Sequence, residues 1–182
     1  SNTEEVGYKI NAGKILAMYK TEDVFNGLIL GKTLRDEFEN TYGAPLKTVE
    51  NPEDVGITQE GTMKHEYPWG YAVSQLLDGR RVISKIYITT DEIKAPKNTS
   101  VGMTFDQVTE KFRDLGQLAN DKGDRGIYND DNGWAEIRQG ESQEDLQVLE
   151  YAVYTVDGTT WLLHYYGKND KIVAISHHFK VE

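Results

Sequence analysis

The chain has 182 residues, 38% of them hydrophobic, which suits one medium-sized domain or two small ones with a buried core. Its net charge is −10, and its 20 basic residues are scattered, whereas nucleic acids and anionic membranes bind clustered Lys and Arg, so we expect neither as a partner. The absence of cysteine excludes disulfides, thiol catalysis and cysteine metal sites.

Residues 1–25 are expected to form an N-terminal arm, in which Ser1-Asn2 is typical of an expression-tag remnant. No apolar run reaches the ~20 residues that a membrane helix needs. From the polar start and the lack of cysteine we predict that a signal segment, or a lipid-carrying anchor, has been removed. The expected location is extracellular or in the cell envelope, with membrane contact only through that anchor.

One short pattern occurs twice in the chain. Leu30-Gly31-Lys32-Thr33 is followed about 70 residues later by Val101-Gly102-Met103-Thr104, and an amphipathic stretch follows each copy. Each stretch is predicted to be a helix that begins at its threonine, because Asp36 or Gln107 stands three residues further on, as in a capping box. Gly43 and Gly116 are expected to end these helices.

Alternating sequence follows each helix and predicts antiparallel strands. Asp78-Gly79, Asp157-Gly158 and the segment 167–170 are hairpin signals between such strands. Alternation in the strand 81–89 places Val82, Ser84, Ile86 and Ile88 on one face. The predicted fold class is therefore α+β, with two tandem helix-plus-antiparallel-sheet repeats at 26–94 and 95–182.

A family resemblance rests on this pattern. Leu-Gly-x-Thr, an amphipathic helix, Tyr42-Gly43-Ala44-Pro45 and a tyrosine-rich meander resemble the tandem repeats of beta-lactamase inhibitor proteins and outer-membrane-assembly lipoproteins. The chain looks closer still to uncharacterised Gram-positive lipoproteins built from two such units. The resemblance implies a fold and an envelope location. The second copy departs from the pattern, since no Pro follows Leu115-Gly116.

Aromatic residues are the main functional signal, because most of the 11 Tyr and 3 Trp of the chain lie in predicted strands. In the strand 160–166, Trp161 and Tyr165 share one face, while His164 and Tyr166 share the other, which we expect to be an open surface. Tyr and Trp offer large contact areas at small entropic cost, but aromatic residues also favour strands for structural reasons. The candidate partner-binding residues are Trp69, Tyr71, Trp134, Trp161, His164 and Tyr166.

The four histidines were considered as metal ligands or catalytic groups. His177 and His178 are adjacent and therefore point to opposite faces of a strand, while His164 is expected to approach one of them across the last hairpin. Further ligands are not fixed by the sequence, so no metal site is predicted. No nucleophile elbow and no phosphate-binding loop is present, and we expect no catalytic residue and no cofactor.

These observations predict a non-enzymatic binding module for an unknown protein or cell-wall ligand. The acidity of the chain would favour a basic partner. One alternative is a hydrolase-type enzyme that uses His164 with a carboxylate. A second alternative is an immunity-type protein inhibitor.

Overall fold

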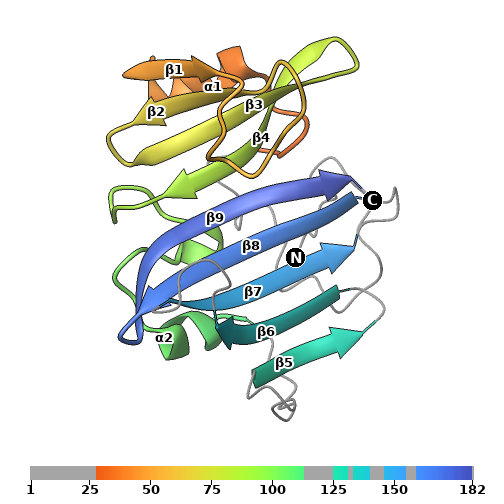
Figure 1. Ribbon diagram of the computed structural model, residues 1–182. Coiled ribbons are helices and arrows are strands. Elements are labelled where there is room, and N and C mark those ends of the chain that lie inside the picture. Colours follow the sequence, from red (N-terminus) through yellow and green to blue (C-terminus); the bar gives the residue numbers. More distant parts are fainter. Residues whose placement is uncertain (1–27, 113–124, 131–132, 140–145, 155–158, 182) are drawn as a thin grey trace.

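A computed structural model describes residues 28–112, 125–130, 133–139, 146–154 and 159–181. These residues form one antiparallel sheet of nine strands in the order β1-β2-β3-β4-β9-β8-β7-β6-β5 (Figure 1). The strands are β1 (Lys47–Glu50), β2 (Met63–Tyr67), β3 (Gly70–Leu77), β4 (Arg80–Ile88), β5 (Arg125–Asp130), β6 (Gly133–Gln139), β7 (Gln147–Tyr154), β8 (Thr159–Lys168) and β9 (Lys171–Val181). The predicted arm at 1–25 lies outside the described residues.

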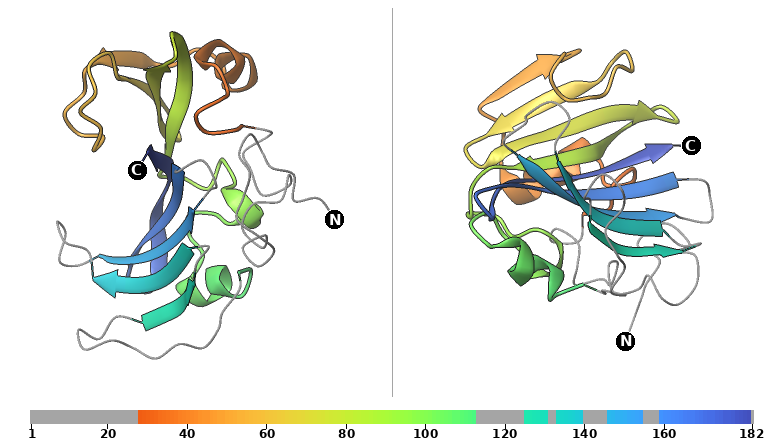
Figure 2. Two further views of the ribbon diagram at one scale, coloured as in Figure 1. Left: turned by 90° about the vertical axis from the view of Figure 1, so that its right-hand side faces the viewer. Right: turned by 60° about the horizontal axis from the view of Figure 1, so that its bottom comes forward.

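Two short α-helices, α1 (Arg35–Tyr42) and α2 (Phe105–Thr109), lie on the same side of this sheet (Figure 2). A 3-10 helix, η3 (Pro96–Asn98), precedes α2 in the chain. The fold is therefore dominated by the antiparallel sheet, with helices on one face. We call the side of the sheet opposite α1 and α2 the open face.

The strands before and after α2 belong to one continuous sheet, a point that the sequence left undecided. β4 pairs with β9, and Lys85–Ile88 lie opposite Ile175–His178. This pairing joins segments about 90 residues apart in the chain, so it carries a cost in loop-closure entropy that local hairpins do not.

Two of the predicted hairpin turns are confirmed. Asp78 and Gly79 have φ values of 51° and 75°, and Asn169 and Asp170 have φ values of 51° and 64°. Two successive positive φ angles are those of a type I′ turn, which matches the right-handed twist of the flanking strands. The predicted turn at 157–158 lies outside the described residues.

One of the two predicted helix starts is confirmed and the other is wrong. Thr104 caps α2, because its Oγ1 accepts a hydrogen bond from the Gln107 amide at 3.1 Å and its own amide donates to the Gln107 side chain at 2.9 Å. The prediction for Thr33 is wrong, because its Oγ1 accepts a hydrogen bond from the Ile29 amide at 2.8 Å. α1 therefore begins one residue later, with Leu34 as N-cap and the Glu37 carboxylate accepting from the Leu34 amide.

The predicted helix ends differ in the same way. Gly43 ends α1 at a φ of 84°, as expected. The second helix is shorter than predicted, since α2 ends at Thr109, and Gly116 lies outside the described residues. Phe112, which follows α2, is nevertheless buried in the core with Tyr151.

The predicted alternation in β4 is broken by a β-bulge. Ser74 of β3 pairs with Ile83 and Val73 pairs with Lys85, so Ser84 is the extra residue. The bulge turns Ile83 to the helix side, where it joins Ile86 and Ile88 in the core. The expected face of Val82, Ser84, Ile86 and Ile88 is therefore wrong at its first two positions.

The hydrophobic core lies between the sheet and the helix side of the molecule. It is rich in aromatic rings, which fill much of this layer beside the two short α-helices of the described residues. Its larger members include Phe38, Tyr67, Trp69, Ile83, Ile86, Phe105, Phe112, Tyr151, Trp161, Leu163 and Tyr165.

Gly70, the first residue of β3, occupies a position that admits no side chain. Its φ is 144°, and a Cβ atom there would lie 2.0 Å from the Tyr87 carbonyl oxygen on the neighbouring β4. We expect Gly70→Ala to destabilise the protein by more than ~2 kcal/mol, because the paired backbone of β4 would have to move. Thermal unfolding measures this loss. Gly79→Ala, which also has a positive φ but nothing within 4 Å, is the control, and an equal loss in both variants would contradict the steric argument.

Candidate functional site

The open face carries four of the six predicted binding residues. Tyr71 lies on β3, Trp134 on β6, and His164 and Tyr166 on β8, and all four side chains are half-buried. The predicted alternation of β8 is confirmed, because Trp161, Leu163 and Tyr165 belong to the core on the opposite face.

Trp69 and Trp161 are not on the open face, and their prediction as binding residues is corrected to a place in the core. Trp69 is 6% exposed and stacks on Tyr67, with ring centroids 4.9 Å apart. Trp161 is 2% exposed and meets His177 edge to face at 5.8 Å. Alternation placed Trp161 with Tyr165, opposite the face expected to be open, and packing on the helix side buries both residues.

A polar group on the open face is built around Glu150 on β7, a residue that the sequence did not single out. Its carboxylate accepts a hydrogen bond from Trp134 Nε1 at 2.6 Å and lies 3.4 Å from Arg138 Nη2. His164 Nε2 lies 2.5 Å from the second carboxylate oxygen. We call Trp134, Arg138, Glu150, His164 and Tyr166 the Glu150 cluster.

Strand register brings the Glu150 cluster together. Glu150 lies directly opposite Glu136 on β6 and opposite His164 on β8, and Trp134 and Arg138 lie two residues to either side of Glu136. Side chains two residues apart on a strand share a face, so three strands present these groups at one place. Hydrogen bonds between β6, β7 and β8, and not any sequence motif, create the cluster.

The contacts of Glu150 keep its carboxylate ionised. Burial alone would raise the pKa of this side chain, but the hydrogen bond and charge of His164, the Trp134 N–H and the Arg138 guanidinium together lower its pKa to about 2. A buried carboxylate with fixed charge orients the imidazole that it contacts. The Glu150 cluster therefore holds His164 in one position at neutral pH.

His164 also connects the Glu150 cluster to its neighbours on the sheet. Its Nδ1 lies 3.2 Å from the Tyr166 hydroxyl, and its ring centroid lies 5.3 Å from that of His178 on β9. This confirms the expectation that His164 approaches one member of the His177-His178 pair across the last hairpin. His177 points into the core instead.

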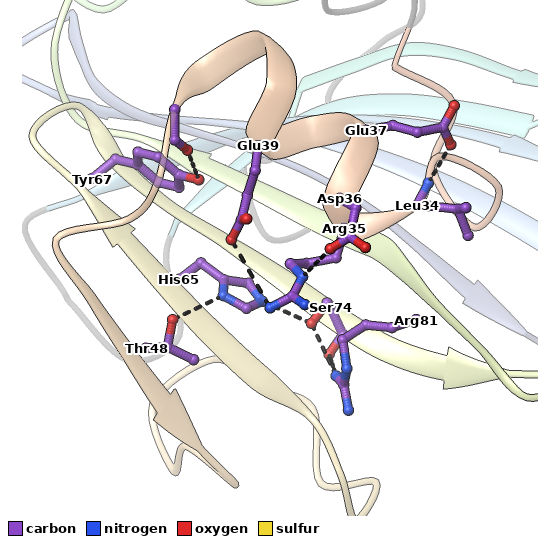
Figure 3. Close-up of polar contacts among 11 residues, drawn as sticks. Leu34, Arg35, Asp36, Glu37, Glu39, Thr48, His65, Tyr67, Ser74 and Arg81 are labelled. Atoms are coloured by element: carbon purple, nitrogen blue, oxygen red, sulfur yellow. Dashed lines mark hydrogen bonds and ion pairs between the residues drawn. The ribbon is translucent and has the colours of Figure 1, made fainter.

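A second polar network lies beneath α1, on the helix side of β1, β2 and β3 (Figure 3). His65 Nδ1 lies 3.2 Å from the Thr48 hydroxyl, and its Nε2 lies 2.8 Å from the Ser74 hydroxyl. Arg81 donates to the Ser74 hydroxyl at 3.0 Å. No sequence motif predicts this network, because strand register and the β4 bulge bring its residues together.

The His65 network has the atoms of a serine–histidine pair but not the access that catalysis needs. Ser74 is fully buried and His65 is 2% exposed. Burial, followed by the charges of Arg35 and Arg81, lowers the pKa of His65 to about 4, so the imidazole is neutral. A neutral, buried pair satisfies polar groups in the core, which is the role that we assign to it.

Within the described ranges, no group of three or more His, Asp or Glu side chains is placed to hold a metal ion. Among the described helices, none has the length and apolarity needed to cross a bilayer.

Comparisons with protein-family models, with curated proteins and with solved structures find no match to this chain. The function is therefore argued from the geometry of the open face.

Proposed function

We propose that the protein is a non-enzymatic binding module of the cell envelope, and that the open face binds a cell-wall ligand. One observation carries this proposal: the open face presents half-buried aromatic and polar side chains that are already held in place. Trp134 and His164 are both fixed on the ionised Glu150 carboxylate. Side chains that are ordered before binding lose less entropy when a ligand arrives.

The composition of the open face also suits recognition. Tyr71 and Tyr87 stack with centroids 4.9 Å apart, and Tyr166 lies 6.3 Å from Tyr87, so a row of rings crosses from β3 to β8. Aromatic side chains beside fixed hydrogen-bonding groups recur where proteins bind ligands.

The envelope location and the repeat organisation belong to this proposal. The lack of cysteine and the resemblance to tandem-repeat lipoproteins support them. Equivalent backbone hydrogen bonds in the two segments also support a repeat. The Gly31 amide donates to the Ile83 carbonyl, and the Gly102 amide donates to the Ile172 carbonyl, both at 2.8 Å. We infer that 26–94 and 95–182 are two copies of one unit that share the sheet.

Hydrolysis is the second candidate function, because His164 and Glu150 do come together as a base and its carboxylate. The hydroxyl beside His164 is that of Tyr166, whose pKa is raised to about 12, chiefly by burial and then by Tyr87. A phenol with this pKa stays protonated at neutral pH and is a poor nucleophile. Ser176, which lies opposite His164 on β9, is 1% exposed. Binding is therefore the better supported function.

Co-sedimentation with purified peptidoglycan sacculi tests the proposed function. We expect the wild-type protein to pellet with the sacculi, and the double variant His164→Gln/Tyr166→Ala to lose most of this binding, by roughly tenfold or more. Leu46→Ala, at a side chain that is 74% exposed beside β1, is the matched control and should bind like the wild type. Failure of the wild-type protein to pellet, or equal pelleting of the double variant, would overturn the proposal.

A further inference from the structure

The part of the open face formed by β2, β3 and β4 carries a group of hydrogen-bond donors. Tyr71 and Tyr87 lie directly opposite each other in the register of β3 and β4, and their rings stack at an interplanar angle of 18°. Lys64 Nζ lies 4.8 Å and Lys85 Nζ lies 5.6 Å from the centre of the Tyr71 ring. We call these four residues the donor cluster.

The ammonium groups of the donor cluster differ in how their charge is neutralised. Lys64 forms an ion pair with Asp54 at 2.8 Å, and the Asp54 side chain is 66% exposed. Lys85 donates a hydrogen bond to the Val55 carbonyl oxygen at 2.9 Å. Among the described residues, no carboxylate lies within ion-pair distance of Lys85. The half-buried Lys85 ammonium is thus held by a neutral acceptor.

Burial disfavours the charged form of the Lys85 side chain. It lowers the pKa of the ammonium group to about 8; Asp54 opposes this effect, and Lys64 adds to it. Removing an ammonium group from water is unfavourable unless an anion accompanies it. An anion beside Lys85 would therefore be stabilised and would return the pKa toward its ordinary value.

The two tyrosine hydroxyls add neutral donors beside these charges. Burial raises the pKa of both Tyr71 and Tyr87, so both phenols keep their protons at neutral pH. Within the described ranges, neither hydroxyl forms a hydrogen bond. A protonated phenol donates well to a charged oxygen, and such charge-assisted hydrogen bonds are the strong ones.

We propose that the donor cluster binds an oxyanion of the ligand, a carboxylate or a phosphate, with Lys85 as its counter-ion and the hydroxyls of Tyr71 and Tyr87 as donors. This inference rests on the proposed function, because it names the chemistry that one end of the open face recognises. Cell-wall polymers carry both kinds of oxyanion. The site selects negative charge locally, although the whole chain has a net charge of −10.

The simplest competing explanation is that Lys85 only anchors the segment of Val55 to the sheet through its hydrogen bond. Glu66 lies opposite Tyr71 in the register of β2 and β3, and His178 lies opposite Lys85 across β4 and β9. Neither forms an ion pair with Lys85 among the described residues. An anchor would show no preference among anions, so the two explanations differ in a measurable way.

The experiment follows the titration of Lys85 by NMR in protein labelled with ¹³C at the lysine ε carbon. The resonance is assigned with the Lys85→Arg variant, and titrations are recorded at equal ionic strength in chloride, acetate and inorganic phosphate. We expect acetate or phosphate to raise the pKa of Lys85 by at least about half a unit over chloride. Acetate alone would identify a carboxylate site, phosphate alone a phosphate site, and both a general oxyanion site.

Two controls accompany this experiment. The exposed Lys94 is the first control, and its ¹³Cε resonance should not differ among the three salts. The double variant Tyr71→Phe/Tyr87→Phe retains both rings and should lose most of the anion effect. The inference would be overturned if the pKa of Lys85 were the same in all three salts. It would also be overturned if acetate or phosphate raised that pKa equally in the double variant. Failure to bind sacculi with an intact anion effect at Lys85 would overturn the proposed function alone.

Discussion

Acidification from about pH 7.5 to about pH 5 is expected to lower the free energy of unfolding by about 6 kcal/mol, which is enough to unfold many domains. The cause is the burial of three imidazoles. Burial, followed by nearby positive charges, lowers the pKa of His65 to about 4. Burial also lowers the pKa of His177 and, with the charges of His164 and Lys85, that of His178, both to about 3.

The direction of the effect follows from proton uptake. Below pH 6.5, the ordinary histidine pKa, these three imidazoles bind protons in the unfolded chain. In the folded chain they stay neutral until the pH falls to between 4 and 3. Stability is therefore full above about pH 7 and is lost as the pH falls, by about 2 kcal/mol for each histidine at pH 5. The carboxylates with lowered pKa values, Glu150 and Asp54, act at lower pH.

Urea unfolding followed by tryptophan fluorescence at a series of pH values measures this loss. Its slope between pH 6 and pH 5 should correspond to about two and a half protons per molecule. His178→Gln, at the half-buried position, should reduce the slope by about one proton while His65 and His177 keep theirs. An unfolding free energy that stays level from pH 7.5 to pH 5 would show that these imidazoles are not held neutral in the fold.

The second large effect is a difference in stability between alanine variants at Trp161 and Tyr166, two aromatic residues of β8. We expect Trp161→Ala to cost about 3–5 kcal/mol, because it leaves a cavity in the core where the side chain is 2% exposed. Tyr166→Ala should cost less than about 2 kcal/mol, because its half-buried ring lies on the open face and contacts Tyr87 and His164. Guanidinium unfolding of the two variants measures the difference.

Trp69→Ala provides a second core substitution for this comparison. Trp69 is 6% exposed and packs against Phe38, Tyr42 and Tyr67, so its loss should resemble that of Trp161. If Tyr166→Ala were as costly as both tryptophan substitutions, Tyr166 would be a core residue, and the open face would lose its role as a binding surface.

Features set by neighbouring residues could be predicted from the sequence. Asp78-Gly79 and the turn at 169–170 form hairpins because their residues tolerate positive φ angles. Thr104 and Gln107 form a capping box within four residues. Alternation placed Trp161 and Tyr165 on one face of β8 because successive strand residues point to opposite faces.

Features that depend on competing contacts could not be predicted. Thr33 has the residue type of a helix cap, but the Ile29 amide uses its hydroxyl. The alternation of β4 fails at Ser84 because pairing with β3 admits an extra residue there. Nothing local in the sequence predicts a bulge at this serine.

In the Glu150 cluster, one residue could be predicted from the sequence and its partner could not. The sequence predicts His164 as a candidate because alternation along the strand places it with Tyr166 on the face expected to be open. Its partner Glu150 was one of 30 acidic residues with no distinguishing neighbour. Only the register of β7 and β8, which depends on every pair along both strands, places these two side chains together.

The sequence by itself thus determined the hairpins, one helix cap and the two faces of β8, because these depend on the conformational preferences of a few adjacent residues. The tertiary structure decided that β4 and β9 join one sheet, that Trp69 and Trp161 both lie in its core, and which side chains meet Glu150, His65 and Lys85. Those outcomes depend on strand register and on the packing of the helices against one face, and both are fixed by contacts between residues far apart in the chain.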